Sequence, residues 1–243
     1  MNLLLITHED VVPDKLSENN LPIAKITGRR LEQLNTVIKA TVGKVCKAGM
    51  LNGKIGKATV LSISSTEGIF ELDFTLLPPK KSRVSLIAAL QRPNTFTKIL
   101  HCAVTMGVKE IFFIHSFKVE KSYWQGKRLA DQAVYEELIL GLEQSVDTVL
   151  PKVSFHKLFK PFIEDELPSI KPNSLRLLGN PNGPETIENL SEAEDILLAI
   201  GPEGGFTDYE NQAFMSAGFL PLSLGPRVLR SEFAVAALLA KLS

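Results

Sequence analysis

The chain has 243 residues, 44% of them hydrophobic, and its 27 Lys and Arg residues are balanced by 27 Asp and Glu residues. This length allows one large domain or two small ones, and the composition is that of a globular protein with a sizeable core. The longest purely apolar stretch, Phe233–Ala240, is far shorter than the ~18 residues of a membrane-spanning helix, so we do not expect the chain to span a membrane. Apolar Met1–Ile6, followed closely by Glu9 and Asp10, predicts a buried strand and not an export signal.

Cysteine and histidine usage argues against a metal centre or a disulfide framework. Cys46 and Cys102 lie far apart, and neither belongs to a CxxC pair. The four histidines also lack the spacing of metal ligands. We therefore expect no metal, and a reducing, cytoplasmic location.

Residues 1–72 are expected to form a small β-rich domain such as a barrel. Short apolar runs at Leu3–Ile6, Leu21–Ile26 and Ala58–Ile63 alternate with glycines, as in closely spaced strands. One helix is predicted at about Leu31–Ala40. The stiff, polar segment Pro78–Lys81 indicates a domain boundary in this part of the chain, and we assign residues 73–243 to a second domain.

The second domain is expected to be α/β. Buried strands are predicted at Val84–Leu90 and Glu110–His115, because both runs are almost continuously apolar. Helices are predicted at Phe96–Met106 and at roughly Lys127–Val146. Further strand-like runs occur at Leu175–Leu178, Ile196–Ile200 and Leu220–Leu224. Strands that alternate with helices indicate a parallel sheet with both faces covered.

Glycine follows three of these predicted strands. The three segments are Leu178-Gly179-Asn180, Ile200–Gly205 and Leu224-Gly225-Pro226. In parallel sheets ligands bind at the carboxyl ends of strands, where loops meet helix N-termini. The last third of the chain therefore carries the expected binding site.

The segment Ile200–Phe206, with the sequence IGPEGGF, is the sharpest local motif. Three glycines and one proline produce a sharply bent backbone that a ligand can approach closely. Thr207 and Asp208 resemble helix N-cap residues. No Gly-Lys-Ser/Thr follows, and no GxGxxG occurs, so neither a P-loop nor a Rossmann dinucleotide site is predicted. A tight strand-to-helix connection without a ligand remains the alternative.

The second motif is Leu222–Ala237, with the sequence LSLGPRVLRSEFAVAA. Ser231 is the expected N-cap of a helix, and Glu232 lies in its first turn, where the helix dipole favours a carboxylate. The same dipole disfavours Arg230, which precedes the helix. An anionic partner would explain this arginine, and the candidates are Glu232, Glu203 or a substrate.

The two motifs together closely resemble the C-terminal motifs of the 16S ribosomal RNA uridine-N3 methyltransferases, the RsmE family of the SPOUT superfamily. The resemblance covers the whole chain in outline. Arg29–Lys44 and Asn52-Gly53 fall where the family has a small RNA-binding barrel similar to a PUA domain. Two positions depart from the family pattern: Phe233 replaces a small polar residue, and Val146–Thr148 replace a segment in which many members carry an arginine.

The resemblance implies a parallel-sheet domain with a deep C-terminal trefoil knot, preceded by the PUA-like barrel. It also implies a homodimer, and S-adenosylmethionine held in a bent shape largely by main-chain groups. The cofactor-binding positions that it implies are Leu178, Gly179, Asn180, Ile200, Gly201, Pro202, Glu203, Gly204, Gly205, Leu222, Leu224, Gly225, Val228, Leu229 and Arg230.

Charge is distributed unevenly along the chain in a way that suits an RNA partner. Residues 78–130 carry ten Lys or Arg against two Glu, a net charge of +8, whereas residues 131–243 have a net charge of −9. A basic surface on a neutral molecule can bind phosphates, although a solvated helix face explains the charges equally well. The RNA-binding candidates are Arg29, Arg30, Lys118, Lys121, Lys127 and Arg128. Tyr123-Trp124 lies among them and could stack on bases or anchor a loop.

The expected reaction is methyl transfer to uridine N3 in small-subunit ribosomal RNA. The N3 proton must leave, so we expect Glu203 or Glu232 to accept it, directly or through water. Arg230 is expected to stabilise the negative charge that spreads to the flanking carbonyl oxygens. The alternatives are a SPOUT methyltransferase with another RNA target, a non-catalytic RNA-binding or ribosome-assembly protein, and a small-molecule enzyme that binds phosphate at Gly201–Gly205.

Overall fold

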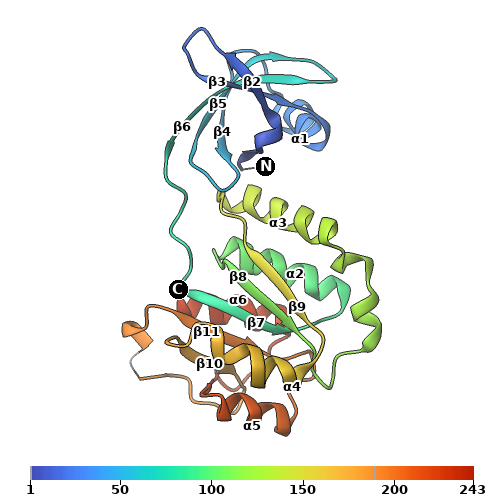
Figure 1. Ribbon diagram of the computed structural model, residues 1–243, viewed down its shortest axis with the longest axis vertical. Helices are drawn as coiled ribbons and strands as arrows, with labels where there is room; N and C mark the ends of the chain where they lie inside the picture. Colours follow the sequence, from blue (N-terminus) through green and yellow to red (C-terminus); the bar gives the residue numbers. More distant parts are fainter. Residues whose placement is uncertain (1, 189) are drawn as a thin grey trace. The chain divides into compact units, whose positions relative to one another are not determined.

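A computed structural model of the chain describes residues 2–188 and 190–243 (Figure 1). The chain divides into two compact units. Unit 1 comprises Met1–Lys80 and Ile139–Leu150, and unit 2 comprises Lys81–Leu138 and Pro151–Ser243. Each unit contains one six-stranded sheet.

The sheet of unit 1 has the strand order β1-β4-β5-β6-β3-β2. Only its β1–β4 pair is parallel; the other neighbours are antiparallel. Its strands are β1 (Leu4–Ile6), β2 (Val11–Leu16), β3 (Pro22–Ile26), β4 (Val45–Met50), β5 (Ile55–Ile63) and β6 (Gly68–Leu76). The three predicted apolar runs are confirmed as β1, β3 and part of β5. The sequence did not reveal β2, because its residues are half-buried or exposed and show no apolar run.

One short helix of unit 1 packs on this sheet. Helix α1 (Gly28–Gln33) begins three residues before the predicted start and continues as a π-helical turn, Leu34–Ile38. The turn ends at Lys39, whose φ of 49° is left-handed. Leu31 and Leu34 are buried in the core of the unit with Phe70. A 3₁₀ turn, His8–Asp10, separates β1 from β2.

The sheet of unit 2 is parallel throughout, as predicted, with the strand order β12-β10-β11-β7-β8-β9. Its strands are β7 (Val84–Ala89), β8 (Glu110–Ile114), β9 (Lys152–His156), β10 (Leu175–Gly179), β11 (Ile196–Ile200) and β12 (Leu220–Leu222). Every residue of β7 and β11 is buried, which explains their continuous apolar sequences. Strand β9 was missed, because its residues KVSFH are exposed or half-buried and include three polar side chains.

The longer helices are α2 (Pro93–Thr105), α3 (Asp131–Ser145), α5 (Asp208–Ser216) and α6 (Ser231–Leu242). Helices α2 and α6 pack against each other. The prediction that α3 starts at Lys127 was wrong: Lys127–Leu129 forms a separate 3₁₀ turn, η4, and Ala130 is extended. Helix α3 starts in unit 2 and ends in unit 1. The remaining helical segments are η3 (Lys121–Gln125), α4 (Phe159–Pro161), η5 (Phe162–Glu166), η6 (Leu167–Ser169) and η7 (Leu190–Glu192).

The parallel sheet of unit 2 gathers its loops at one edge. Because its strands run in the same direction, the loops after β7, β8, β10, β11 and β12 all emerge there. Across residues 2–188 and 190–243, no helix combines the length and apolar character needed to cross a membrane.

Candidate functional site

The glycine-bearing loops after β10 and β12 are joined by main-chain hydrogen bonds. The Asn180 N–H donates to the Leu222 carbonyl at 3.0 Å, and the Ser223 N–H donates to the Pro184 carbonyl at 2.8 Å. Gly225 has a φ of 99°, which a residue with a side chain rarely adopts. Because β10 pairs with both β12 and β11, three of the predicted binding segments lie at neighbouring strand ends.

The loop after β11 requires glycine at two positions. A Cβ at Gly201 would lie 2.8 Å from the Phe206 nitrogen, so a side chain there would displace backbone. Gly205 has a φ of 67°, and its N–H donates to the Pro202 carbonyl at 2.7 Å. The loop is therefore a narrow turn with exposed main-chain groups, which suits a ligand that binds to the backbone.

The predicted cofactor positions divide into buried and exposed side chains. Leu178, Ile200 and Leu222 are at most 5% exposed, because their side chains belong to the core. Such residues can offer a ligand only main-chain N–H and C=O groups. By contrast, Val228 is 87% exposed and Leu229 is 42% exposed, on the loop between β12 and α6.

Gln91 anchors this site and was not identified from the sequence. It follows β7, is 2% exposed, and its Nε2 donates to the Gly201 carbonyl at 3.0 Å and to the Ala89 carbonyl at 3.1 Å. Its Oε1 is buried and accepts no hydrogen bond from the described residues. The amide therefore fixes the loop after β11 to the end of β7.

Glu210 anchors the start of α5 to the loop after β8. One carboxylate oxygen accepts hydrogen bonds from the Thr207 N–H and hydroxyl at 2.8 and 2.9 Å. The other accepts the Phe117 N–H at 2.8 Å. Thr207 is the N-cap of α5, so the helix start predicted there is confirmed. Glu210 is only 2% exposed, and its bonds satisfy a carboxylate that burial would otherwise destabilise.

Both carboxylates expected to accept a proton are paired with cations from the region of α2. Arg92 Nε lies 3.0 Å from Glu203 Oε2, and the Thr95 hydroxyl donates to Glu203 at 3.3 Å. Lys98 Nζ lies 3.4 Å from Glu232 Oε1. Arg230 was expected to pair with Glu203 or Glu232, but it forms an ion pair with neither carboxylate.

Arg230 is exposed, and its guanidinium has no ion pair with any described residue. The prediction that Ser231 caps α6 was wrong, because the N-cap is Arg230 and Ser231 is the first helical residue. The Arg230 carbonyl accepts the Ala234 N–H at 2.9 Å, which closes the first turn. Glu232 lies in this turn, as predicted. The Arg230 side chain is thus available to an anionic group at the glycine loops.

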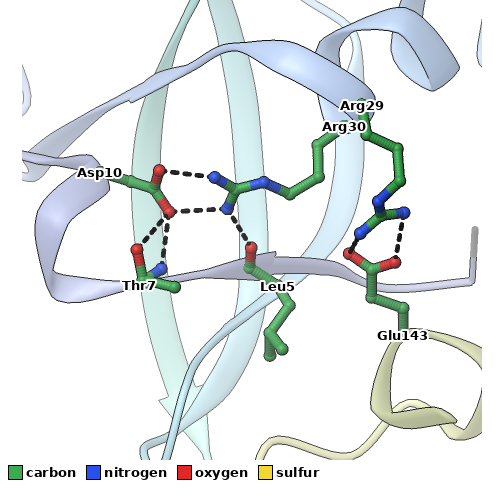
Figure 2. A network of polar contacts seen from close by, with 6 residues as sticks. All are labelled: Leu5, Thr7, Asp10, Arg29, Arg30 and Glu143. Carbon is green, nitrogen blue, oxygen red and sulfur yellow. Dashed lines mark hydrogen bonds and ion pairs between the residues drawn. The ribbon is translucent and has the colours of Figure 1, made fainter. Parts of the chain in front are cut away.

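Arg29 and Arg30, the RNA-binding candidates of unit 1, form internal ion pairs (Figure 2). Arg29 donates through both terminal nitrogens to the two oxygens of Glu143. Arg30 donates to both oxygens of Asp10 and to the Leu5 carbonyl, each at 2.7 Å. These contacts direct both guanidinium groups toward protein acceptors.

Among the RNA-binding candidates of unit 2, Lys118 contacts a glycine loop. Lys118 Nζ donates to the Gly204 carbonyl at 2.6 Å, and Arg128 donates to the Thr97 hydroxyl at 2.9 Å. Lys121 and Lys127 are exposed. Trp124 is half-buried, and its Nε1 donates to His115 Nδ1 at 2.9 Å, which supports the anchoring role for this ring.

The described residues outside the glycine loops offer one open cavity and no metal-binding cluster. A cavity of about 730 Å³ lies at the opposite edge of the sheet, between Lys171–Leu175 and Glu192–Asp195, where β10 and β11 begin. It contains none of the predicted site residues. Within the part of the chain that is described, no group of three or more His, Cys, Asp or Glu residues could hold a metal ion.

Known proteins resemble this chain over the region that carries the glycine loops. The model of a family described as RNA methyltransferase domain matches residues 78–243. Ribosomal RNA small subunit methyltransferase E of Mesomycoplasma hyopneumoniae is 30% identical over 66% of this chain and 69% of its own length. The chain belongs to this family of RNA methyltransferases.

Other family members resemble the chain over its whole length. The Treponema pallidum enzyme of the same name is 26% identical over 98% of this chain and 88% of its own length. The Neisseria gonorrhoeae enzyme, solved bound to S-adenosyl methionine, superposes with a TM-score of 0.77 over 99% of this chain and 96% of its own. At 23% identity, that superposition establishes a shared fold.

The two departures from the usual family residues lie in different environments. Phe233 is 60% exposed on the first turn of α6. Asp147 is 4% exposed, and its Oδ1 accepts the Val149 N–H at 2.9 Å. Neither residue belongs to the turn Gly201–Gly205. Both positions therefore lie outside the main glycine turn of the candidate site.

Proposed function

We propose that the chain is an S-adenosylmethionine-dependent methyltransferase that acts on N3 of a uridine in 16S ribosomal RNA. The observation that carries this proposal is family membership combined with an intact set of glycine loops at one sheet edge. RNA methyltransferase relatives and a cofactor-bound relative of the same fold support the choice of cofactor and substrate.

The residues of the three loops fit this cofactor. Gly201 allows the backbone of Phe206 to approach too closely for any side chain, and Gly205 and Gly225 hold left-handed turns. We assign the cofactor to Leu178–Asn180, Ile200–Gly205 and, around the loop between β12 and α6, to the main chain of Leu222, Leu224, Gly225, Val228, Leu229 and Arg230. When bound, it supplies a methyl group that is electrophilic because it is attached to a sulfonium.

The protein must activate uridine N3, which carries a proton and is otherwise a poor nucleophile. Glu203 or Glu232 would accept this proton, directly or through water. Arg230 would stabilise the negative charge that develops on the flanking carbonyl oxygens. The exposed, unpaired state of the Arg230 guanidinium among the described residues supports this role.

Finer features of the family extend the proposal. We propose that residues 73–243 form the catalytic domain, that its C-terminal part is a deep trefoil knot, and that the chain acts as a homodimer. We further propose that residues 1–72 form a PUA-like barrel that binds RNA, and that the protein acts in the cytoplasm, where ribosomal RNA is available.

Two matched glycine variants test the cofactor site. Gly205 and Gly218 both have positive φ, 67° and 86°, and a Cβ at either position meets no atom within 4 Å. Gly218 precedes β12, at the opposite edge of the sheet. Alanine should therefore strain both turns equally, by about 1 kcal/mol. Calorimetry should show weaker S-adenosylmethionine binding for Gly205→Ala and unchanged binding for Gly218→Ala.

Methyl transfer to purified small-subunit RNA, followed by nucleoside analysis, tests the reaction. Formation of N3-methyluridine supports the proposal. A methylated product at another base would leave the cofactor site intact and identify a different RNA target. Failure of the wild-type chain to bind the cofactor, with and without RNA, would reject an enzymatic role.

A further inference from the structure

Phe117, in the loop after β8, is an aromatic side chain that the fold does not use. It is 82% exposed, although Ser116 is fully buried and Val119 is 5% exposed. The loop therefore enters the interior on both sides and projects outward at Phe117 and Lys118. Truncating this ring would remove almost no packing from the folded protein.

The backbone that carries this ring is held firmly. The Phe117 N–H donates to Glu210 Oε1 at 2.8 Å, and Glu210 is also bonded to Thr207 at the start of α5. The Val119 N–H donates to the Ser116 carbonyl at 2.9 Å, which closes the turn around Phe117. An exposed ring on an anchored turn loses little conformational entropy when a flat ligand packs on it.

Two exposed lysines, Lys118 and Lys121, follow Phe117 in the chain, and this loop contacts the glycine loop after β11. The adjacent Lys118 reaches the Gly204 carbonyl, and a Cβ at Gly204 would lie 3.0 Å from Lys118 Cδ. Arg92 reaches Glu203, the neighbouring residue of the same loop. Lys121, three residues after Lys118, is exposed. The nearest acidic residue in the sequence, Glu120, is bonded to the Tyr123 hydroxyl at 2.8 Å.

We propose that Phe117 is a stacking platform for an unpaired base of the RNA substrate, and that Lys118 and Lys121 bind the phosphates on either side of that base. An aromatic ring among cations is the arrangement that binds single-stranded RNA, since each base has a face to stack and each nucleotide a charge to neutralise. This inference rests on the proposed function, and it assigns to the same site a contact with a nucleotide of the substrate.

A second copy of the chain is a less suitable occupant of this surface. A symmetric interface buries the same patch of both subunits, so the lysines around Phe117 would lose their hydration in both copies at once. RNA supplies the opposite charge. The surface therefore fits RNA better than it fits itself.

The test compares Phe117→Leu with Phe117→Trp. Leucine keeps an apolar side chain but removes the aromatic face, whereas tryptophan extends that face. With oligouridylate and a 16S ribosomal RNA transcript as probes, Phe117→Leu should bind at least about fivefold more weakly, and Phe117→Trp as tightly as the wild type or more tightly. Leu220→Ala is the control, because Leu220 is an exposed apolar residue at the start of β12.

Two further readouts separate stacking from a merely structural role. Tryptophan fluorescence of Phe117→Trp should be quenched by oligouridylate more than that of the wild type, whose single tryptophan is Trp124. Lys118→Gln should reduce the slope of the logarithm of the RNA-binding constant against the logarithm of salt concentration by about 0.7. Cofactor affinity should stay within about twofold for Phe117→Leu, because the ring lies outside the glycine turns.

The outcomes distinguish this inference from the proposed function. If the wild type methylates RNA and Phe117→Leu retains full RNA affinity, the stacking platform is wrong and the function stands. If Phe117→Leu instead turns a dimer into a monomer without weakening RNA binding, the surface contacts a second copy. If the wild type binds neither RNA probe, both the inference and the RNA substrate fail.

Discussion

Arg29 and Glu143 form a bidentate ion pair within unit 1, in which each terminal guanidinium nitrogen lies 2.9 Å from one carboxylate oxygen (Figure 2). The Glu143 side chain is 4% exposed, whereas that of Arg29 is 42% exposed. The Glu143 carbonyl also accepts the Leu3 N–H at 3.0 Å. Glu143 thus joins the last turns of α3 to α1 through its side chain and to the residue before β1 through its main chain.

We expect Arg29→Ala to lower the free energy of unfolding by about 3 kcal/mol, because it leaves a buried carboxylate without a counter-charge. The double variant Arg29→Ala/Glu143→Leu should recover part of that loss, since the unpaired charge is then absent. Urea unfolding at neutral pH measures both. A single variant as stable as the wild type would mean that water reaches Glu143 freely, and Arg29 would then be available to RNA.

Asp10 provides a pH-dependent contribution to the stability of unit 1. Burial raises the pKa of this carboxyl, but hydrogen bonds from Arg30 and Thr7 and the charge of Arg30 outweigh burial and hold the pKa below its usual value. A carboxyl with a lowered pKa stabilises the folded state above its unfolded pKa of about 3.9, and this stabilisation disappears as the pH falls through the folded pKa. The difference in unfolding free energy between wild type and Asp10→Asn should therefore be large at pH 7 and shrink below pH 4. A difference independent of pH would contradict the assignment.

The sequence predicted β7 and β11, because short apolar runs are typical of strands buried on both faces. Strands β2 and β9 were invisible, since partly exposed strands mix polar and apolar residues. The glycine motifs identified the loops of the candidate site, because a tight turn requires glycine at fixed positions in the sequence. The residue that holds one of these loops in place has no such local pattern. Gln91 and Gly201 are 110 positions apart, and only the fold brings them together.

The lowered pKa of Glu232 bears on the choice between the two proposed proton acceptors, both of which are paired with cations. A hydrogen bond from its own N–H lowers the pKa of the Glu232 carboxyl most, burial opposes this, and Lys98 and Arg230 lower it further. A carboxylate with a lowered pKa is a weaker base near pH 7. We therefore expect Glu232→Gln to keep at least about a third of the wild-type turnover, and Glu203→Gln to lose about 100-fold.

Single-turnover rates at saturating cofactor and RNA, measured from pH 6 to 9, check this difference. Lys98→Met serves as the control, because it removes the ion pair with Glu232 but leaves the carboxylate in place. Equal losses in the two glutamine variants would show that Glu203 has no special role. A loss confined to Glu232→Gln would reverse the assignment.

Arg230 should contribute to turnover much more than to cofactor binding. Its guanidinium is free of ion pairs among the described residues, and it lies at the N-cap of α6. A positive charge placed where negative charge develops is worth about 10²-fold or more in rate. We expect Arg230→Ala to lower kcat by about that factor, with the Kd for S-adenosylmethionine changed less than about threefold. Arg230→Lys should restore part of the rate, because it returns the charge without the planar donor group.

Arg227 provides the matched control for this prediction. It is an exposed arginine on the same loop, three residues earlier, and no ion pair joins it to another described residue. If the loop needs only a general positive charge to attract RNA, Arg227→Ala and Arg230→Ala should raise the KM for RNA equally and leave kcat unchanged. If Arg230 acts on the transition state, only Arg230→Ala should lower kcat at saturating RNA. Equal losses of kcat and cofactor affinity in Arg230→Ala would instead make this arginine a cofactor-binding residue.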